Sequence, residues 1–171
     1  MAVFARKVTP ADAREFLALM SESKSLHDPW IKPPLDERTF DLYMDRVSQP
    51  DHEGFLICHS RTRNLVGVIN VNNIVRGSFL SASLGYYVGL PYLGKGYMQE
   101  GIQLVKLHAF KTLGLHRLEA NIQPENRRSI ALVQRSGFHK EGLSPAYLYI
   151  AGAWRDHERW AIIDPRLKYS I

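Results

Sequence analysis

A chain of 171 residues with 45% hydrophobic and 23% charged residues is long enough to bury one continuous core, so we expect a single domain over residues 1–171. No segment is apolar over the length of a membrane span and the first residues lack a secretory-signal pattern, so we expect a cytoplasmic protein that does not bind membranes. The net charge of +5 suits phosphorylated ligands or RNA-rich particles, but it is equally typical of a mildly basic soluble protein and indicates no direct reading of nucleic acid.

The N-terminal part predicts one strand followed by two helices. Residues 3–8 are β-rich, and Thr9-Pro10-Ala11-Asp12 then combines an N-cap, a proline at the first helical position and an acid at the third. Apolar residues at helical spacing continue this helix to Met20. The proline-containing stretch 25–34 predicts an irregular loop, and the spacing from Phe40 to Val47 predicts the second helix.

The middle of the chain predicts three strands and a helix. Residues 54–59 and 65–72 read as an antiparallel hairpin, and residues 81–88 as the next strand. Cys58 lies within the first of these apolar runs and is placed like a core residue. A glycine- and proline-containing turn then leads into a helix that Gly114 ends as the C′ residue.

The C-terminal part predicts a strand, a helix and a hairpin. Residues 117–123 alternate between apolar and polar, residues 124–137 form a shorter helix, and residues 147–150 and 154–164 pair as the last two strands. The element order predicts an α/β protein in which helices cover both faces of a mixed sheet. Two halves of such a sheet can splay apart, which frees backbone groups for an extended ligand.

The turn from Val88 to Met98 is the clearest candidate binding site. Gly94-Lys95-Gly96 lies between a strand and a helix, so backbone amides and the positive end of the helix dipole face one point, where an anion is favoured. An ordinary glycine-rich turn is the alternative. A dinucleotide fingerprint would need glycine at the position of Gln99, and a Walker loop would need Ser or Thr after Gly-Lys, so neither is expected.

Several runs of residues, taken together, resemble the GNAT acetyltransferase superfamily. They are residues 84–88, 94–98, 124–129 and 136–138. Within that superfamily, residues 73–79 and 152–157 make the chain similar to the RimJ/RimL type, the ribosomal-protein-alanine N-acetyltransferases. The likeness covers most of the chain. It implies a GNAT-like fold whose central, mostly antiparallel sheet is splayed at the cofactor site, with acetyl-CoA as the acyl donor and no metal.

The resemblance also implies which residues hold acetyl-CoA. In the family, the strand before the turn pairs with the pantetheine arm, and a backbone NH, here near Val88, faces the thioester. The pyrophosphate pattern lies over residues 93–98, but Leu93 replaces a polar residue and Met98 a small one, so backbone amides carry most of the contact. The expected cofactor-binding residues are Tyr87, Val88, Leu93, Gly94, Lys95, Gly96, Tyr97, Met98, Asn126 and Ser129.

Acetyl transfer to an amine calls for proton transfer at two places. A chain-terminal amine has a pKa of about 7.7 to 8.0 and is largely protonated near neutrality, so a base is useful. Glu119, on the polar face of its strand beside the expected split, is the first choice, and a solvated strand carboxylate is the alternative. Ser129 either protonates the leaving thiol or is a helix-surface serine. RimJ-like relatives often carry an acid where this chain has Ala146.

The acceptor is the part of the function with most alternatives. His27 and Trp30 lie where related enzymes form the acceptor groove and are candidate substrate contacts, and a packed loop tryptophan is the slightly favoured alternative. The resemblance implies transfer to a primary amine, the N-terminal alanine of a ribosomal protein, by a monomer or homodimer. The alternatives are acetylation of a small amine and a non-catalytic CoA-binding or ribosome-associated module. A polycationic amine would favour acidic residues in the loop, and residues 25–34 contain only Asp28.

Overall fold

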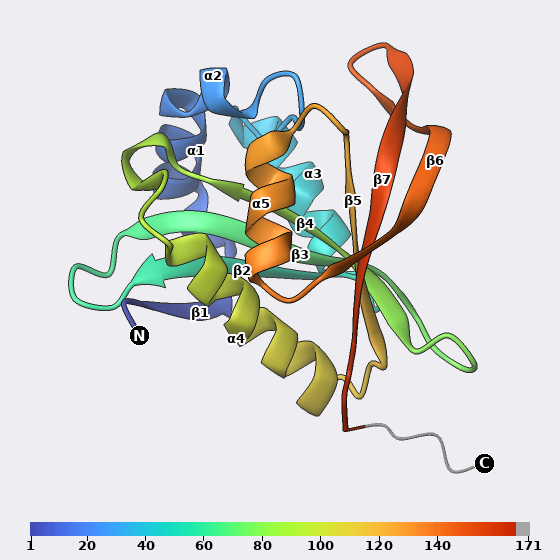
Figure 1. The fold of residues 1–171 in the computed structure, drawn as a ribbon. Coiled ribbons are helices and arrows are strands. Elements are labelled where there is room, and N and C mark those ends of the chain that lie inside the picture. The colour runs from blue at the N-terminus through green and yellow to red at the C-terminus, as the bar shows by residue number, and fades with distance from the viewer. Residues whose placement is uncertain (167–171) are drawn as a thin grey trace.

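The computed structural model describes residues 1–166, in which a seven-stranded sheet lies between two layers of helices (Figure 1). The strands follow one another across the sheet in the order β1-β2-β3-β4-β5-β7-β6, and every neighbouring pair is antiparallel except β4 and β5. Their bounds are β1 Val3–Lys7, β2 Glu53–His59, β3 Leu65–Val75, β4 Ser81–Val88, β5 Arg117–Ile122, β6 His139–Ile150 and β7 Ala153–Ile163. The predicted mixed, mostly antiparallel sheet is confirmed.

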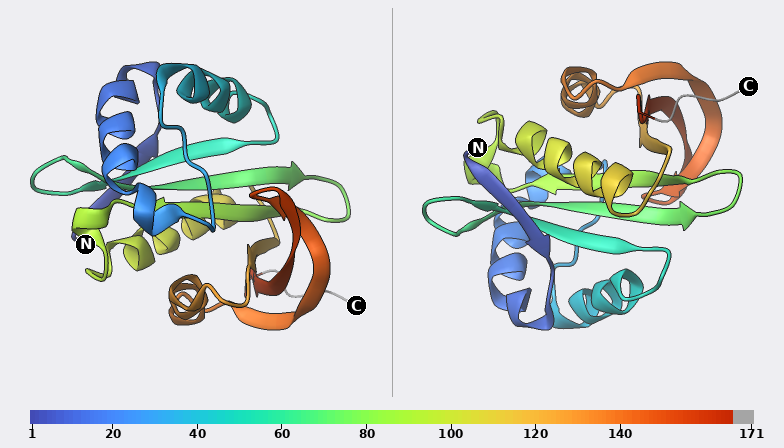
Figure 2. Two further views of the ribbon diagram at one scale, coloured as in Figure 1. Left: turned by 90° about the horizontal axis from the view of Figure 1, so that it is seen from above. Right: turned by 90° about the horizontal axis from the view of Figure 1, so that it is seen from below.

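Helices cover both faces of this sheet, also as predicted. Figure 2 shows α1 and α3 on one face and α4 and α5 on the other. The helices are α1 Ala13–Glu22, α2 Lys24–His27, α3 Glu37–Val47, α4 Tyr97–Lys111 and α5 Arg127–Arg135, with 3₁₀ turns η1 Pro10–Asp12 and η2 Leu90–Tyr92. Within residues 1–166, none of the helices is both long enough and apolar enough to cross a bilayer.

Three details differ from the sequence-based expectations. The short helix α2, Lys24–His27, extends into the stretch 25–34 that was expected to be irregular. Strand β6 begins at His139 rather than at residue 147, because two register shifts, beside Gly142 and around Pro145, let an interrupted apolar pattern continue as one bent strand. Helix α4 is capped by Thr112, so Gly114 lies one residue beyond the C′ position.

The sheet splits between β4 and β5. These strands pair only from Ser81 to Ser83, opposite residues 117–119 of β5. Beyond that point β5 continues to pair with β7 as far as Ile122, and the last five residues of β4 have no β5 partner. The β6–β7 hairpin curves away from β1–β4 (Figure 2). The expected splay is therefore present at the C-terminal end of β4.

Each face of the sheet has its own apolar core. Phe16 of α1 is fully buried, with its ring centroid 5.1 Å from that of Phe40 and 6.3 Å from that of Tyr87. Cys58 is buried in the same cluster, as expected. On the other face, Ile102 and other apolar residues of α4 and α5 pack against the sheet. The two cores hold β4 from both sides.

Helix α2 is tied to the end of β4 by His27. Its Nε2 lies 2.8 Å from the carbonyl oxygen of Val88, and its ring packs against Tyr87 at 5.6 Å between centroids. Because a carbonyl only accepts, Nε2 carries the hydrogen, and the buried Nδ1 has no partner among residues 1–166. Burial lowers the pKa of His27, although the bond to Val88 opposes this. The ring therefore stays neutral and positions the end of β4.

Gly67 of β3 allows the end of β4 to approach closely. A Cβ at this position would lie 2.7 Å from both the Met98 Sδ and the Tyr87 carbonyl oxygen. We expect Gly67→Ala to lower the free energy of unfolding by about 1–3 kcal/mol through overpacking, measured by urea unfolding. At Gly142 an added Cβ meets nothing within 4 Å, so Gly142→Ala is the matched control and should change stability by less than about 0.5 kcal/mol. Equal effects of the two substitutions would contradict this account.

The buried His27 predicts a pH-dependent contribution to stability. Its lowered pKa means that the unfolded chain binds a proton more readily, so the stabilisation is complete above the unfolded pKa of about 6.5 and is lost as the pH falls below it. We expect His27→Gln, which retains an N–H for Val88, to differ most from the parent protein at pH 7.5 and to converge with it towards pH 5.5. Urea unfolding at several pH values measures this, with the exposed His139→Gln as control. A pH-independent difference would contradict it.

Candidate active site

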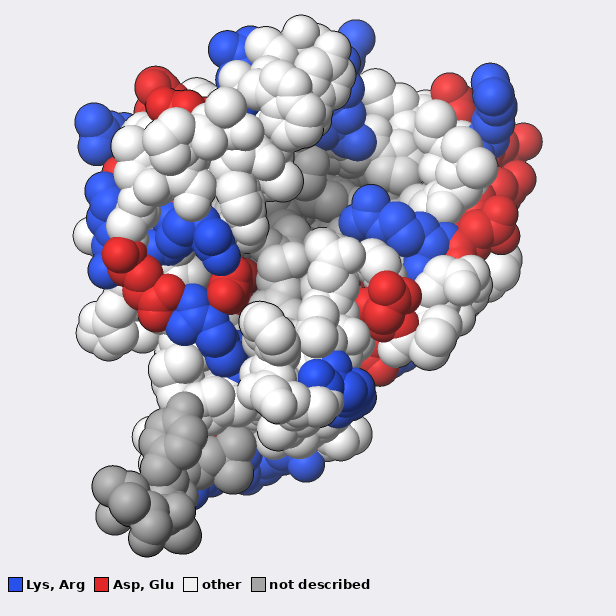
Figure 3. Space-filling model, turned by 90° about the vertical axis from the view of Figure 1, so that its right-hand side faces the viewer, with Lys and Arg blue, Asp and Glu red and all other residues white. Residues whose placement is uncertain are grey.

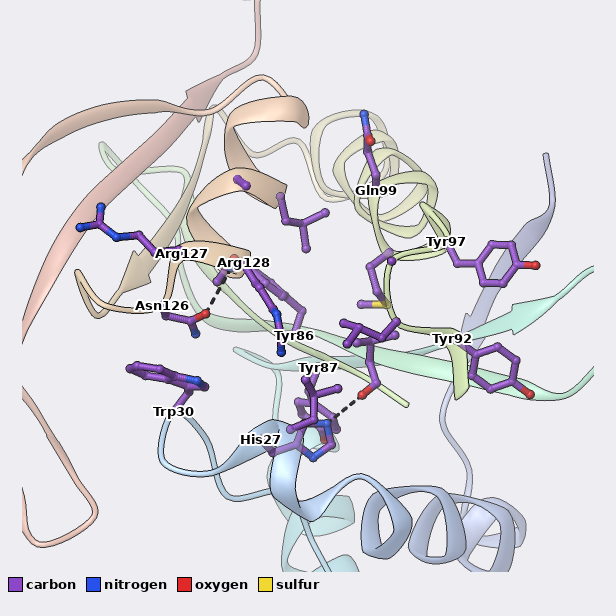
Figure 4. A pocket seen from close by; sticks show the side chains of 18 of the residues that line it. His27, Trp30, Tyr86, Tyr87, Tyr92, Tyr97, Gln99, Asn126, Arg127 and Arg128 are labelled. Atoms are coloured by element: carbon purple, nitrogen blue, oxygen red, sulfur yellow. Dashed lines mark hydrogen bonds between the residues drawn. The ribbon is translucent and has the colours of Figure 1, made fainter. Parts of the chain in front are cut away.

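A cavity of about 560 Å³ opens beside the end of β4. Residues from α2, the turn before α4 and the start of α5 surround it (Figure 4). It is lined by Leu26, His27, Trp30, Ile31, Tyr86, Tyr87, Val88, Tyr92, Leu93, Gly94, Gly96, Tyr97, Met98, Gln99, Asn126, Arg127, Arg128, Ser129, Ala131, Leu132 and Arg135. All the residues expected to hold a cofactor line this cavity except Lys95.

The turn before α4 presents backbone amides to the cavity. Gly94 and Gly96 have φ angles of 76° and 78°, a left-handed conformation that favours glycine. The first helical bond of α4 is donated by Glu100 to Gly96, at 3.2 Å, so the amides of residues 97–99 have no acceptor within the helix. Together with the helix dipole they favour an anion. The Nζ of Lys95 lies 5.8 Å from the centre of the Tyr92 ring.

Arginines line the other side of the same cavity. Arg127 and Arg128 stand at the start of α5 and Arg135 at its end, and no Asp or Glu is among the described residues of the lining. Arg128 extends into the cavity, whereas Arg127 points away from its centre (Figure 4). Sequence reasoning missed these side chains, although two adjacent arginines after the N-cap Asn126 were a usable signal. The cavity is suited to phosphate groups.

The end of β4 offers a free main-chain amide to the cavity. The amide of Gly89 donates to the Val66 carbonyl at 2.8 Å, so Gly89 bonds towards β3. In an antiparallel pair the bonding direction alternates along the strand, which turns the amide and carbonyl of Val88 away from β3. The Val88 carbonyl accordingly accepts from His27, and its amide faces the split.

Two adjacent tyrosines of β4 have different environments. The ring of Tyr87, expected at the cofactor, is 6% exposed and belongs mainly to the core around Phe16. The hydroxyl of Tyr86 instead lies 2.6 Å from the Ser129 Oγ. Burial raises the pKa of Tyr86, so the phenol stays protonated and this pair holds exchangeable hydroxyl hydrogens. The alternation of side chains along a strand was the signal that Tyr86 and Tyr87 face opposite sides.

Asn126 orders the start of α5 around this hydroxyl pair. Its Oδ1 accepts a hydrogen bond from the Ser129 amide at 3.2 Å, which makes it the N-cap of α5 (Figure 4). Both Asn126 and Ser129 lie in the cavity wall. The cap therefore holds the Ser129 hydroxyl next to Tyr86.

A second cavity, of about 390 Å³, lies across the split. It is lined by Trp30, Ile31, Arg46, His52, Asn72, Asn73, Ser83, Leu84, Gly85, Tyr86, Ala120, Asn121, Ile122, Gln123, Asn126, Ser129, Leu148, Ile150 and His157. Trp30, Ile31, Tyr86, Asn126 and Ser129 line both cavities. The two cavities therefore meet at the Tyr86–Ser129 hydroxyl pair.

The described residues of the second cavity include no Asp or Glu. On the side of the molecule that carries β6 and β7, Figure 3 shows a hollow with mainly uncharged walls and charged side chains around its rim. Within the cavity wall, the buried Oδ1 of Asn121 has no hydrogen-bond partner among residues 1–166. An unpaired buried acceptor favours a ligand that brings an N–H or O–H group.

Glu119 lines neither cavity and is held by two arginines. Its carboxylate accepts from the Arg117 Nε at 2.8 Å and from the Arg159 Nη2 at 2.6 Å. Burial alone would raise the pKa of Glu119, but these hydrogen bonds and charges outweigh it and hold the pKa below its ordinary value. A carboxylate of this kind accepts protons weakly. The geometry therefore does not support the expectation that Glu119 is the base.

The two residues expected to contact the acceptor substrate, His27 and Trp30, have different surroundings in the structure. His27 lines only the first cavity and is 5% exposed. Its Nε2 is hydrogen-bonded to the Val88 carbonyl, so His27 holds the end of β4 in place. Trp30 lies in the wall of both cavities.

Of the turn residues, Met98 is 7% exposed and packs in the core, while Leu93 is 37% exposed at the cavity mouth.

Comparisons with known proteins find N-acetyltransferases that are similar in sequence to this chain. The probable N-acetyltransferase YjcK of Bacillus subtilis is 31% identical over an alignment 171 positions long, which covers 95% of this chain and 94% of that protein. The ribosomal protein uS5-alanine N-acetyltransferase of Escherichia coli is 43% identical over 103 residues, 60% of this chain and 53% of that enzyme. The spermidine N(1)-acetyltransferase of Vibrio cholerae is 22% identical over 156 residues, 88% of this chain and 87% of that enzyme.

Solved structures and family models point the same way. The structure of Mycobacterium smegmatis RimJ in complex with CoA-disulfide superimposes with a TM-score of 0.87 and 27% identity, over 98% of this chain and 84% of that one. Residues 3–139 match the family model described as an acetyltransferase (GNAT) domain. The chain therefore belongs to the GNAT acetyltransferase family, and it is an N-acetyltransferase.

Proposed function

We propose that the protein transfers the acetyl group of acetyl-CoA to the N-terminal amine of a polypeptide, with alanine on a ribosomal protein as the acceptor. The observation that carries the proposal is the pair of cavities that meet at Tyr86 and Ser129 across the split in the sheet. One cavity is basic and bordered by free amides, and the described residues that line the other include no carboxylate. This arrangement suits a phosphorylated donor and an amine acceptor that approach each other from two sides.

The first cavity would hold acetyl-CoA. The amides of residues 97–99 and the side chain of Arg128 would bind its diphosphate, with Gly94 and Gly96 allowing the close approach. Val88 would pair with the pantetheine arm through its free main-chain groups, and Asn126 and Ser129 would border the arm near its sulfur. Coenzyme A bound to the RimJ of Mycobacterium smegmatis supports this assignment.

Catalysis would rest on groups at the meeting point of the cavities. The amine would attack the thioester carbonyl, and the amide of Val88 would stabilise the oxyanion that develops. The Ser129 hydroxyl, bonded to the buried Tyr86, would supply the proton that the leaving thiolate needs. Tyr86 would then replenish Ser129, because either hydroxyl of the pair is able to donate.

The second cavity favours a polypeptide over a polyamine. A polycation such as spermidine is recognised through carboxylates, and the described residues of this cavity include Arg46 and two histidines but no acid. The similarity to ribosomal-protein-alanine acetyltransferases supports the same choice. The similarity to a spermidine acetyltransferase makes a small amine the competing acceptor to be tested.

The acceptor assignment is tested by turnover with matched amines. We expect thiol release and a mass gain of one acetyl group with peptides that begin with alanine, and a kcat/KM at least about tenfold lower with spermidine, equivalent to about 1.4 kcal/mol. Peptides with a blocked N-terminus serve as controls. Turnover of spermidine but not of peptides would overturn the acceptor proposal, and CoA binding without any turnover would support a binding module instead.

The cofactor site is tested at Gly96. Alanine at this left-handed position costs about 1–3 kcal/mol and tilts the first amides of α4, so Gly96→Ala should raise the Kd for CoA about tenfold, as measured by calorimetry. Gly77 in the β3–β4 turn has a φ of 67°, and an added Cβ there also meets nothing within 4 Å. Gly77→Ala is therefore a control with the same backbone strain away from both cavities. A similar loss of CoA affinity in the two variants would contradict the assignment.

A further inference from the structure

His157 of β7 lies in the wall of the second cavity and has a fixed tautomer. Its Nδ1 is 2.9 Å from the main-chain carbonyl oxygen of Arg155. A carbonyl only accepts, so the hydrogen of the neutral ring is on Nδ1, and Nε2 carries a lone pair. This is the arrangement that a proton acceptor needs, with one ring nitrogen held by the protein and the other available.

The Nε2 of His157 is open to the cavity. Nε2 has no hydrogen-bond partner among residues 1–166. It is not among the polar side-chain atoms that are both unpartnered and fully buried, so part of its surface is accessible. The residue as a whole is only 2% exposed. Because His157 lines the second cavity, a ligand in that cavity is what reaches Nε2.

The charged and titratable groups around His157 leave few other acceptors. From β6, Ser144 lies opposite His157 and the Tyr147 ring is 6.0 Å away between centroids, with the Arg159 guanidinium 4.8 Å from the Tyr147 ring. The other charged or titratable residues of the cavity wall are Arg46, His52 and Tyr86. His52 is engaged by the carboxylate of Asp51, at 2.8 Å.

The neighbouring strand adds a second polar atom that awaits a donor. Asn121 of β5 lines the same cavity, and its buried Oδ1 lacks a partner. An ammonium group would bring N–H donors to the accessible Nε2 of His157, whereas the Asn121 Oδ1 itself has almost no accessible surface in this structure. The wall is therefore built for a group that donates hydrogen bonds and gives up a proton.

We propose that His157 is the catalytic base of this enzyme. This deepens the proposed function, on which it rests. An N–H bond of the acceptor ammonium breaks and its proton passes to Nε2, which leaves a lone pair on nitrogen. That pair forms the C–N bond to the thioester carbonyl carbon, and the C–S bond then breaks. The nitrogen passes its second excess proton to the Tyr86–Ser129 hydroxyl pair, which replaces the proton that Ser129 gives to the sulfur, so one proton in total passes through His157 to solvent.

The test is the pH dependence of kcat in His157→Asn, since an asparagine Nδ2 retains the donor to Arg155 but removes the lone pair. With an alanine peptide as acceptor, we expect kcat at pH 7 to fall at least about 100-fold, the usual contribution of a general base. The loss should shrink as the pH rises past the amine pKa of about 7.7 to 8.0, because the amine then needs no base. The affinity for CoA should stay within twofold.

Control variants and an NMR measurement make the result decisive. His139→Asn, an exposed histidine outside both cavities, should leave the profile unchanged. A pH-independent loss in His157→Asn, or a shifted acid limb in Glu119→Gln or His52→Asn instead, would overturn the proposal. If the His157 variants do not fold, ¹⁵N NMR of the parent protein tests the tautomer, and a ring protonated on Nε2 alone would overturn it. Absence of turnover in the parent protein would refute the proposed function, whereas an unchanged profile in an active, folded His157→Asn would refute only the role of His157.

Discussion

The constraint on which the site depends is the interruption of hydrogen bonding between β4 and β5. Parallel pairing stops after Ser83, so the remainder of β4 keeps its outward amide and carbonyl groups unpaired by the sheet. An open sheet edge inside a molecule is unfavourable unless its polar groups find partners. Here His27 satisfies one carbonyl, and the adjoining cavities provide room for a ligand to satisfy the rest. The site is thus a gap in the sheet that the surrounding core keeps open.

The charges on the two sides of this gap are unequal. Three arginines line the first cavity, whereas the second holds one arginine and two histidines, and the described residues of both linings include no carboxylate. Glu119, the acid that the sequence favoured as the base, forms salt bridges with Arg117 and Arg159 and lines neither cavity. A polar strand face identifies a residue that is able to face a split, but whether its charge is already neutralised depends here both on Arg117 of the same strand and on Arg159 of the neighbouring β7.

The fold and the first cavity follow from local patterns, and the second cavity does not. The glycine turn, the Asn126 cap and the strand from Ser81 to Val88 are each encoded within a few neighbouring residues. Alternation would also have separated Tyr86 from Tyr87. By contrast, the second cavity combines residues from α3, β3, β4, β5, β6 and β7, which are far apart in the sequence, and its residues from β6 follow register shifts that no short pattern predicts.

The described residues of the bent β6–β7 hairpin contribute to the second cavity and not to the first. Between Arg135 and the last described residue, 166, no residue lines the first cavity, whereas Leu148, Ile150 and His157 of the hairpin line the second. Under the proposed function, changes in the hairpin other than at His157 would therefore alter which acceptor fits while leaving the donor side intact. In a sequence of this architecture, divergence confined to the hairpin with His157 retained would then signal a change of substrate, and divergence in the glycine turn would signal loss of the reaction itself.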